Sequence, residues 1–411
     1  MMQMTSNRWI YIPIEVKVRE LDAKLLLSYY AIQQGYQVII GGDHPMVTEL
    51  TTHFPNGIFF AKGGPKGFRK RTITRAIENG QSIVELDEEG LLIEKFKYIR
   101  DRMRKDMLQY IVQEYCWGGE HQKQIISSAY PDMAKKCQVV GNPRLDLLTA
   151  KYREIYREEA STIQKNYQDF ILVNTRFPLY NGAKGIKDNV YVEPIKKLYL
   201  AFEEMIEETA KEFPYLNIVI RPHPGENIRS YQQTFKQLQN VHVIHEGSII
   251  KWLLAAKVII HNGCTSGMEA FLLDKPVIAF LPFAETNNSL PNQLGIQVKN
   301  IATLHQAILN ISNYNMVKKT PGSLYHYCCW ENDSHSFERI LQLCNRISLP
   351  SPPTKLSVPR NIKIQKQKRK FSLVENEIMA FYHKLDLIEQ RSFQRHIERV
   401  AQNVYRVKAG N

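Results

Sequence analysis

Residues able to bind an anion lie in a small-residue turn between two apolar segments. The segments 258–260 and 276–280 have the composition of buried strands, and Asn262-Gly-Cys-Thr-Ser-Gly267 precedes a helix expected at 268–273. A helix start presents unpaired backbone N–H groups and the positive end of the helix dipole, which suit a phosphate. Glycine allows close approach to the backbone, and Thr265 or Ser266 can cap the helix or bind the ligand. The alternative is an ordinary capped turn.

A second candidate group follows the apolar segment 216–220. Arg221, Pro222, His223 and Pro224 come directly after it, and the two prolines restrict the backbone on either side of the histidine. Because parallel strands end at one edge of an open sheet, we expect His223 and the 262–267 turn at the same edge. An imidazole and a guanidinium would then face a bound phosphate. A proline-rich surface loop with a solvated histidine is the alternative.

A third group is acidic. Asp87, Glu88 and Glu89 follow the strand-like segment 82–86 and precede Gly90. Crowded carboxylates raise one another's pKa, which suits a general base or a pair that shares a proton. A solvated acidic turn before a helix is the alternative.

Strand-like and helical segments alternate along most of the chain, which predicts α/β units with parallel sheets. Helices are expected at 21–34 and 145–166. Two doubly wound, Rossmann-like domains are therefore predicted to face a cleft, a common ligand site. Their strands are expected at 9–14, 36–41, 58–61, 82–86, 110–115 and 138–141, and at 170–174, 216–220, 241–244, 258–260 and 276–280.

Composition limits the class of protein. The chain has 411 residues, enough for two domains, and its net charge of +13 indicates polyanionic partners such as nucleic acid, acidic membrane or phosphorylated substrates. Six cysteines without metal-site spacing indicate a reduced, cytoplasmic protein. No signal-peptide core or membrane-spanning run is evident, so any membrane contact is expected to be peripheral.

Together the motifs resemble those of bacterial surface-carbohydrate (lipopolysaccharide or capsule) biosynthesis proteins. These are similar to GT-B glycosyltransferases that use CMP-activated acidic sugars, such as sialyl-, polysialyl- and Kdo transferases. The resemblance covers about residues 8–345 and implies an acceptor domain at 1–165 and a donor domain, with a helix crossing back, at 166–348. It depends on LDEEG (86–90), GNPRLDLL (141–148), ILVNTRF (171–177), RPHPGEN (221–227) and HNGCTSGMEAFLLDKPVIAF (261–280).

The resemblance implies transfer of Kdo or another nonulosonate from a CMP donor to a surface polysaccharide or lipid-linked acceptor. Glu88 or Glu89 would deprotonate the acceptor hydroxyl, although Asp87 also stays open as the catalytic carboxylate. His223 would stabilise or protonate the leaving phosphate, and Glu269 would bind the ribose. No metal or other cofactor is expected. The implied donor-binding residues are Arg221, Pro222, Asn262, Gly263, Thr265, Ser266, Gly267 and Glu269.

Three other functions remain alternatives. The RPHP and TSG motifs also resemble those of CDP-glycerol glycerophosphotransferases of teichoic-acid synthesis, which share the cytidine leaving group. A UDP-GlcNAc epimerase would need its own set of acids and histidines, which the sequence does not display. Nucleic-acid binding would fit the net charge, but the basic residues concentrate at 62–71 and in the tail, and no nucleic-acid-reading motif is present.

The last region, 349–411, differs from the rest. Four prolines at 348–359 indicate a linker, and residues 360–370 are basic without an acid. Apolar residues then recur at spacings of three and four from Val374 to Val404, which predicts one or two amphipathic helices. This tail is expected to bind the anionic inner face of the cytoplasmic membrane. A helical hairpin packed on the protein or in a dimer is the alternative.

Overall fold

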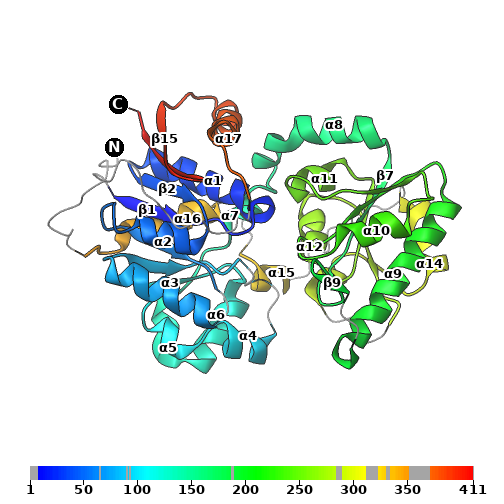
Figure 1. Cartoon of the computed structure of the whole chain (residues 1–411), viewed down its shortest axis with the longest axis horizontal. Helices are drawn as coiled ribbons and strands as arrows, with labels where there is room; N and C mark the ends of the chain where they lie inside the picture. Colours follow the sequence, from blue (N-terminus) through cyan, green and yellow to red (C-terminus); the bar gives the residue numbers. More distant parts are fainter. Residues whose placement is uncertain are drawn as a thin grey trace. The chain divides into compact units, whose positions relative to one another are not determined.

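The structure, a computed structural model, describes residues 8–63, 66–88, 91, 94–186, 189–283, 289–311, 323–329, 334–350 and 371–410. The chain forms two compact units, each built on a largely parallel β-sheet covered by helices (Figure 1). Unit 1 comprises Met1–Leu147 and Gly322–Asn411, and unit 2 comprises Leu148–Pro321. The predicted pair of Rossmann-like α/β units is therefore confirmed, while the cleft between them stays a prediction.

The sheet of unit 1 has a parallel core with an antiparallel addition at one edge. The six strands β1 to β6 run parallel, and β16 pairs antiparallel with β2. In spatial order the strands are β15 (Arg395–Ala401), β16 (Val404–Ala409), β2 (Gln37–Gly41), β1 (Trp9–Ile12), β3 (Ile58–Ala61), β4 (Ser82–Glu85), β5 (Gln113–Cys116) and β6 (Cys137–Val139).

Helices cover both faces of this sheet. Apolar residues of α2, α3 and α6 pack with the strands on one face, and α1 contacts α7, α16 and α17 on the other. The helices are α1 (Lys17–Gln33), α2 (His44–Leu50), α3 (Lys66–Glu78), α4 (Lys95–Asp101), α5 (Lys105–Leu108), α6 (Gly119–Ala129), η1 (Pro131–Lys136), α7 (Pro143–Asp146), α15 (Ser323–Tyr327), α16 (Ser336–Arg346) and α17 (Glu375–Ile388).

Unit 2 has a six-stranded parallel sheet. In spatial order its strands are β11 (Val241–Val243), β10 (Asn217–Arg221), β7 (Phe170–Asn174), β12 (Val258–His261), β13 (Val277–Phe280) and β14 (Ile296–Val298), with a short hairpin of β8 (Asn181–Gly182) and β9 (Gly185–Ile186) apart from it. Its helices are η2 (Tyr152–Tyr156), α8 (Arg157–Tyr167), η3 (Val190–Val192), α9 (Glu193–Glu212), α10 (Ile228–Thr234), α11 (Ile249–Ala255), α12 (Thr265–Leu272), α13 (Leu290–Gln293) and α14 (Ile301–Leu309).

The boundary between the units lies earlier than the sequence suggests. The single helix expected at 145–166 is divided into α7, η2 and α8, and α8 packs on α11 of unit 2 rather than linking two domains. Lys251 of α11 forms an ion pair with Glu159 of α8 at 2.9 Å, which adds a polar contact to this packing. The sequence also missed β14, whose three residues offer little periodicity.

The chain rejoins unit 1 at Gly322, so α15 and α16 both belong to that unit. The carboxylate of Asp146 accepts the backbone N–H groups of Ser336 at 2.9 Å and Phe337 at 3.0 Å, so it caps α16 from a distant part of the chain. The ring of Phe337 stacks on Tyr30 of α1, with centroids 4.0 Å apart. These contacts make α16 part of the first unit.

One of the two helices expected in the tail is present. The helix expected after Val374 is present as α17, but the helix expected at 393–404 is wrong, because this segment forms the hairpin β15–β16. Asn403 at the hairpin turn has φ +59°, a left-handed conformation that asparagine tolerates and a helix interior excludes. The open edge of β2 supplies hydrogen-bond partners for β16, whose Val404 and Val407 are fully buried.

The tail is consequently part of unit 1 rather than a separate domain, and Figure 1 shows the red C-terminal strands beside the blue N-terminal ones. Tyr382 of α17 is buried and its hydroxyl lies 2.6 Å from that of Ser28 in α1. The basic segment 360–370 and most of the predicted linker lie outside the described residues. The prediction of a basic loop at 62–71 is wrong in part, because α3 begins at Lys66.

Candidate functional site

Each sheet has a topological switch point, where successive strands are added on opposite sides of a central strand. In unit 1 the chain runs from β1 out to β2 and returns to β3 on the other side of β1. In unit 2 it runs from β7 out to β10 and β11 and returns to β12 on the other side of β7. Ligands of open α/β sheets bind beyond the carboxyl ends of the strands at such points. The predicted site residues follow the strands at or beside these two points.

Three loops of unit 2 begin at one level of the sheet. Arg221 pairs in register with Asn174, and Ile260 pairs with Val173. His223, Arg176 and Gly263 each lie two residues beyond the ends of β10, β7 and β12. The structure thus brings two of the predicted motifs to one edge, as expected, together with an arginine to which the sequence analysis assigned no role.

The turn before α12 leaves two backbone donors for a ligand. Cys264 is the N-cap residue and makes no side-chain cap, while the N–H groups of Gly263 and Gly267 donate to Asn292 Oδ1 and to the carbonyl of Cys264. Among the described residues, the N–H groups of Thr265 and Ser266 have no acceptor within the protein. These two groups are therefore the available donors at the positive end of α12.

The two glycines of this turn have different roles. Gly263 has φ +59° and bends the chain, and a Cβ there would lie 2.9 Å from Arg176 Nη2 and 3.0 Å from Ser289 Oγ. Gly267 instead packs against the buried ring of His261, whose Nε2 would be 2.3 Å from an added Cβ. This corrects the expectation that the Gly267 backbone holds a phosphate.

The loop after β10 that carries His223 and Pro224 is held by a carboxylate that the sequence analysis did not single out. Glu226 is 4% exposed and accepts from the backbone N–H of His223 at 2.9 Å, the Thr175 hydroxyl at 3.0 Å and the Tyr231 hydroxyl at 2.6 Å. Burial raises the pKa of Glu226, and these donors oppose the rise. The loop after β10 is thus tied to the end of β7 and to α10.

His223 itself is exposed. Its Nδ1 accepts the N–H of Gly225 at 3.1 Å, so in the neutral imidazole the proton resides on Nε2, the atom that can donate to an anion. Buried Pro222 precedes it, and the Pro222 carbonyl lies 2.9 Å from Nδ1 of His245. Pro222 therefore fixes the loop rather than contacting a ligand through its ring.

Arg221 is placed differently from the prediction. Its guanidinium is buried, donates to the carbonyls of Glu246 at 2.8 Å and Gly247 at 3.1 Å, and lies over the ring of Trp252 at 5.4 Å. Burial lowers its pKa to about 10, so it keeps its proton at neutral pH. This arginine supports the 245–248 loop, which corrects the expectation that it pairs with a donor phosphate or carboxylate.

Two further predicted residues are buried. The Asn262 amide donates to the carbonyl of Phe280 at 2.8 Å and so links the ends of β12 and β13. Glu269 lies on α12 and is 1% exposed. Its role toward a ribose stays a prediction.

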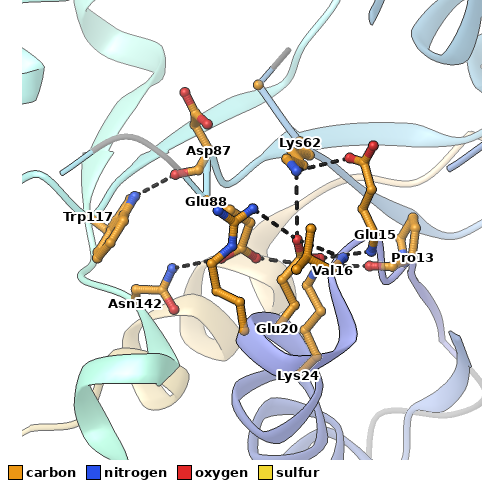
Figure 2. A network of polar contacts seen from close by, with 12 residues as sticks. Pro13, Glu15, Val16, Glu20, Lys24, Lys62, Asp87, Glu88, Trp117 and Asn142 are labelled. Atoms are coloured by element: carbon orange, nitrogen blue, oxygen red, sulfur yellow. Dashed lines mark hydrogen bonds and ion pairs between the residues drawn. The ribbon is translucent and has the colours of Figure 1, made fainter. Parts of the chain in front are cut away.

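In unit 1, the predicted acidic group does not present three equivalent carboxylates. Asp87 is fully buried in a bidentate ion pair with Arg102, with Arg102 Nε 2.7 Å from Oδ2. The Asp87 carbonyl accepts the indole N–H of Trp117 (Figure 2). A Cβ on Gly63 would lie 2.4 Å from its carboxyl carbon. Asp87 is therefore structural. Glu89 lies outside the described residues.

Glu88 belongs to a buried chain of alternating charges (Figure 2). It is 7% exposed, with Lys24 Nζ 3.3 Å from Oε1 and Asn142 Nδ2 3.4 Å from Oε2. Lys24 also donates to Glu20 at 2.7 Å and to the carbonyl of Pro13 at 2.8 Å. With its three donors engaged, Lys24 fixes both carboxylates.

Glu20 occupies what would otherwise be an anion site. Its fully buried carboxylate accepts the backbone N–H groups of Glu15 at 2.9 Å and Val16 at 3.2 Å, at the start of α1. Lys62, which follows β3, lies 3.6 Å from Oε1 of Glu20 and 2.9 Å from Glu15 (Figure 2). The donors at the switch point of unit 1 are thus filled by the chain's own carboxylate.

The pKa values agree with this geometry. Burial alone would raise the pKa of Glu20, but Lys24 and Lys62 hold it well below its usual range. Burial alone would lower the pKa of Lys24, but Glu20 and Glu88 raise it. Burial, with Lys24 nearby, lowers the pKa of His44 to about 3, so this histidine is neutral.

Several site residues escaped the sequence analysis although signals were present. Arg176 and Glu226 lie inside the quoted motifs ILVNTRF and RPHPGEN. Glu20 and Lys24 have the i,i+4 spacing of a helical ion pair, a pattern usually found on exposed faces. The described residues hold no group of three or more His, Cys, Asp or Glu arranged for a metal, and no helix among them is long and apolar enough to cross a membrane.

No protein-family model matches the chain, and no curated protein matches it in sequence. Solved structures do resemble it. UDP-GlcNAc 2-epimerase from Neisseria meningitidis, bound to UDP-GlcNAc, is 14% identical with a TM-score of 0.51, over 84% of this chain and 100% of that one. The Methanocaldococcus jannaschii epimerase, in complex with UDP-GlcNAc and UDP, is 15% identical with a TM-score of 0.52, over 83% and 99%.

The wall teichoic acid polymerase TagF is a further similar structure, 11% identical with a TM-score of 0.54, over 82% of this chain and 88% of that one. At such identities the likeness establishes the fold, which is GT-B, as predicted.

Proposed function

We propose that this chain is a GT-B transferase that uses a cytidine-nucleotide donor, with Kdo or another nonulosonate on CMP as the preferred substrate. The acceptor is a surface polysaccharide or a lipid-linked precursor, and the protein works at the inner face of the cytoplasmic membrane. One observation carries the proposal: the loops that carry His223, Arg176 and the start of α12 follow three adjacent strands at the switch point of unit 2, and Arg176 lies beside Gly263.

The chemistry of these groups suits a leaving phosphate. Negative charge grows on the phosphate as the sugar departs, and donors fixed in advance lower the barrier to that step. The N–H groups of Thr265 and Ser266 and the Nε2–H of His223 are such donors, and Glu226 fixes the backbone of His223. Glu269 is proposed for the ribose hydroxyls.

The proposed general base is Glu89. Asp87 is bound to Arg102, and Glu88 is bound to Lys24 and Asn142, so neither carboxylate is directed at an acceptor hydroxyl. The remaining carboxylate of the motif is Glu89. Replacing it with glutamine should reduce turnover by about 10²-fold or more while donor binding is retained.

A glycerophosphotransferase acting on CDP-glycerol is the second candidate. It is favoured by the similarity to TagF, whose structures include an H444N variant soaked with CDPG, and by the same cluster of phosphate-binding groups. A binding panel separates the candidates. CMP and CDP should raise the melting temperature of the chain, since a ligand that binds only the folded state stabilises it.

UDP and UDP-GlcNAc serve as the matched competitors in that panel, because the epimerases that share the fold were solved with them. Preferential stabilisation by UDP-GlcNAc would contradict the cytidine proposal and favour an epimerase-like activity. Stabilisation by oligonucleotides but by no mononucleotide would favour a nucleic-acid-binding protein. Turnover of CMP-Kdo against CDP-glycerol then distinguishes glycosyl from glycerophosphate transfer.

A further inference from the structure

We propose that Arg176 is the specificity-determining cation of unit 2, which selects phosphorylated over unphosphorylated ligands by pairing with a phosphate of the donor. The inference rests on the proposed function and deepens it. It assigns to Arg176 the role expected of Arg221 from the sequence.

The position of Arg176 is the first argument. It follows β7, the central strand of the switch point, and its guanidinium lies against the turn that follows β12 on the other side of that point. A Cβ on Gly263 would lie 2.9 Å from Nη2 and 3.0 Å from Cζ, and the φ of +59° at this position favours glycine. The guanidinium therefore lies beside the N–H donors that begin α12.

Second, no described residue neutralises this charge. Within the described part of the chain, Arg176 makes no hydrogen bond and no ion pair, whereas Arg102 is paired with Asp87 and Arg221 with two carbonyls. Its side chain is reached by solvent, yet its guanidinium is surrounded by enough protein atoms that burial lowers its pKa. An arginine keeps its proton under such conditions, so a cation stands here without a counter-ion in the described part of the chain.

Ser289 supplies an independent argument. Its hydroxyl oxygen is buried and, among the described residues, has no hydrogen-bond partner. The same hydroxyl lies 3.0 Å from the point where a Cβ on Gly263 would stand, so it lies on the same side of Gly263 as the Arg176 guanidinium. A buried hydroxyl without a partner is costly, and an oxyanion bound beside Arg176 would supply one.

These groups favour phosphate over carboxylate. A phosphate offers three oxygens to donors arriving from different directions, and a guanidinium can bind two of them in a fork. Here the donors follow β7 and β10 and begin α12, and their separate directions suit the tetrahedral oxygens of a phosphate better than the single plane of a carboxylate. The shared chemistry is an oxyanion, so the carboxylate of an acidic sugar is the competing source to be tested.

The experiment is isothermal titration of the full-length protein with CMP, UDP, cytidine, inorganic phosphate and free Kdo. Arg176→Gln should weaken CMP binding by about 10- to 100-fold, the size expected for hydrogen bonds to a charged group. Cytidine, which has no phosphate, should bind both proteins equally. Arg176→Lys should give an intermediate affinity, because it keeps the charge but loses the fork. Arg229→Gln, on the exposed surface of α10, is the matched control and should bind CMP as the wild type does.

The outcomes separate the two proposals. Equal CMP affinity in the wild type and in Arg176→Gln would overturn the role of Arg176 while leaving the cytidine-donor proposal standing. Wild-type binding of phosphate or UDP but not of CMP, with the same loss in Arg176→Gln, would overturn the cytidine donor alone. If Arg176→Gln loses binding of Kdo but not of CMP, the cation serves a sugar carboxylate and the inference is wrong. Should Arg176→Gln unfold, Arg176→Lys and Ser289→Ala decide by the same comparison of CMP with cytidine.

Discussion

The two switch points of this protein have related architectures, but they differ in whether their charged and polar groups are paired within the chain. In unit 1, the donors that follow β1 and β3 are satisfied within the chain, because Glu20 accepts from the Glu15 and Val16 backbone and pairs with Lys24. In unit 2, the described donors beside Gly263 lack an internal acceptor, since Arg176 has no carboxylate and α12 has no side-chain cap. The difference favours unit 2 as the half that would bind an anionic ligand.

The comparison has a simple physical basis. Buried polar groups are nearly always hydrogen-bonded, so a switch point whose donors already bind a carboxylate of the chain has few donors left for a phosphate. A switch point whose donors lack an acceptor is instead stabilised when a phosphate binds. We therefore expect substitutions at the first site to reduce stability and substitutions at the second to reduce ligand binding.

The largest effect should follow removal of residues 371–410. Their loss would expose the edge of β2 and the apolar surfaces that α17 and β16 cover, including those beneath fully buried Ile378, Leu385 and Val407. Each such side chain contributes about 1.5–3 kcal/mol, so unit 1 should lose its cooperative unfolding transition. Calorimetry of the truncated protein tests this. Unit 2 should still melt as a unit and bind CMP, and an unchanged thermogram would show that the tail is an accessory.

The next effect concerns the buried ion network. Lys24→Met would leave Glu20 and Glu88 buried without their shared cation, which should cost about 3–5 kcal/mol of stability. Urea unfolding of the variant gives the value. Lys105→Met removes an exposed ion pair with Asp132, at 3.1 Å, and should have a much smaller effect. Similar losses in the two variants would contradict a special role for the unit 1 network.

A smaller free-energy change, confined to catalysis, is expected in unit 2. His223→Ala should lower turnover by about 10²- to 10³-fold, as when one preorganised donor to a developing negative charge is removed, with little change in melting temperature. Single-turnover kinetics with the preferred cytidine donor measure the loss. His383→Ala, at an exposed position on α17, is the control. Loss of stability without loss of rate would assign His223 to the structure.

The smallest effect is a dependence of stability on pH. Burial lowers the pKa of His44 in unit 1 and of His261 in unit 2 to about 3. The unfolded chain takes up these protons below about pH 6.5 and the folded chain does not, so stability should fall as pH decreases from about 6.5 toward 3. Urea unfolding at pH 7.5 and pH 5 should show a smaller decrease for His44→Gln than for the wild type. The remaining decrease includes the contribution of His261, and an equal decrease in both proteins would contradict the assignment.

Much of the fold was predictable because its strands are short, apolar and separated by helices. The segments at 170–174 and 258–260 appear as buried strands of unit 2 at almost the expected bounds. The hairpin at 395–409 was not predictable from periodicity, because apolar residues such as Ile397, Val400 and Val404 fit the spacing of a helix as well. The unpaired edge of β2, which is distant in sequence, decides the matter by offering hydrogen bonds.

The candidate site likewise has features that the sequence predicts and features that only the folded chain decides. The order of residues along the chain is enough to place His223 and the 262–267 turn at the ends of parallel strands, because that placement depends on local strand and turn signals alone. It could not distinguish Arg221 from Arg176, since both follow a buried strand and both carry the same charge. Only the folded chain brings the carbonyls of Glu246 and Gly247 to one guanidinium and leaves the other beside Gly263. Likewise, Glu88 differs from a free acid only because α1 carries Lys24 to it, and contacts between residues so far apart in the chain form only when the sheet assembles.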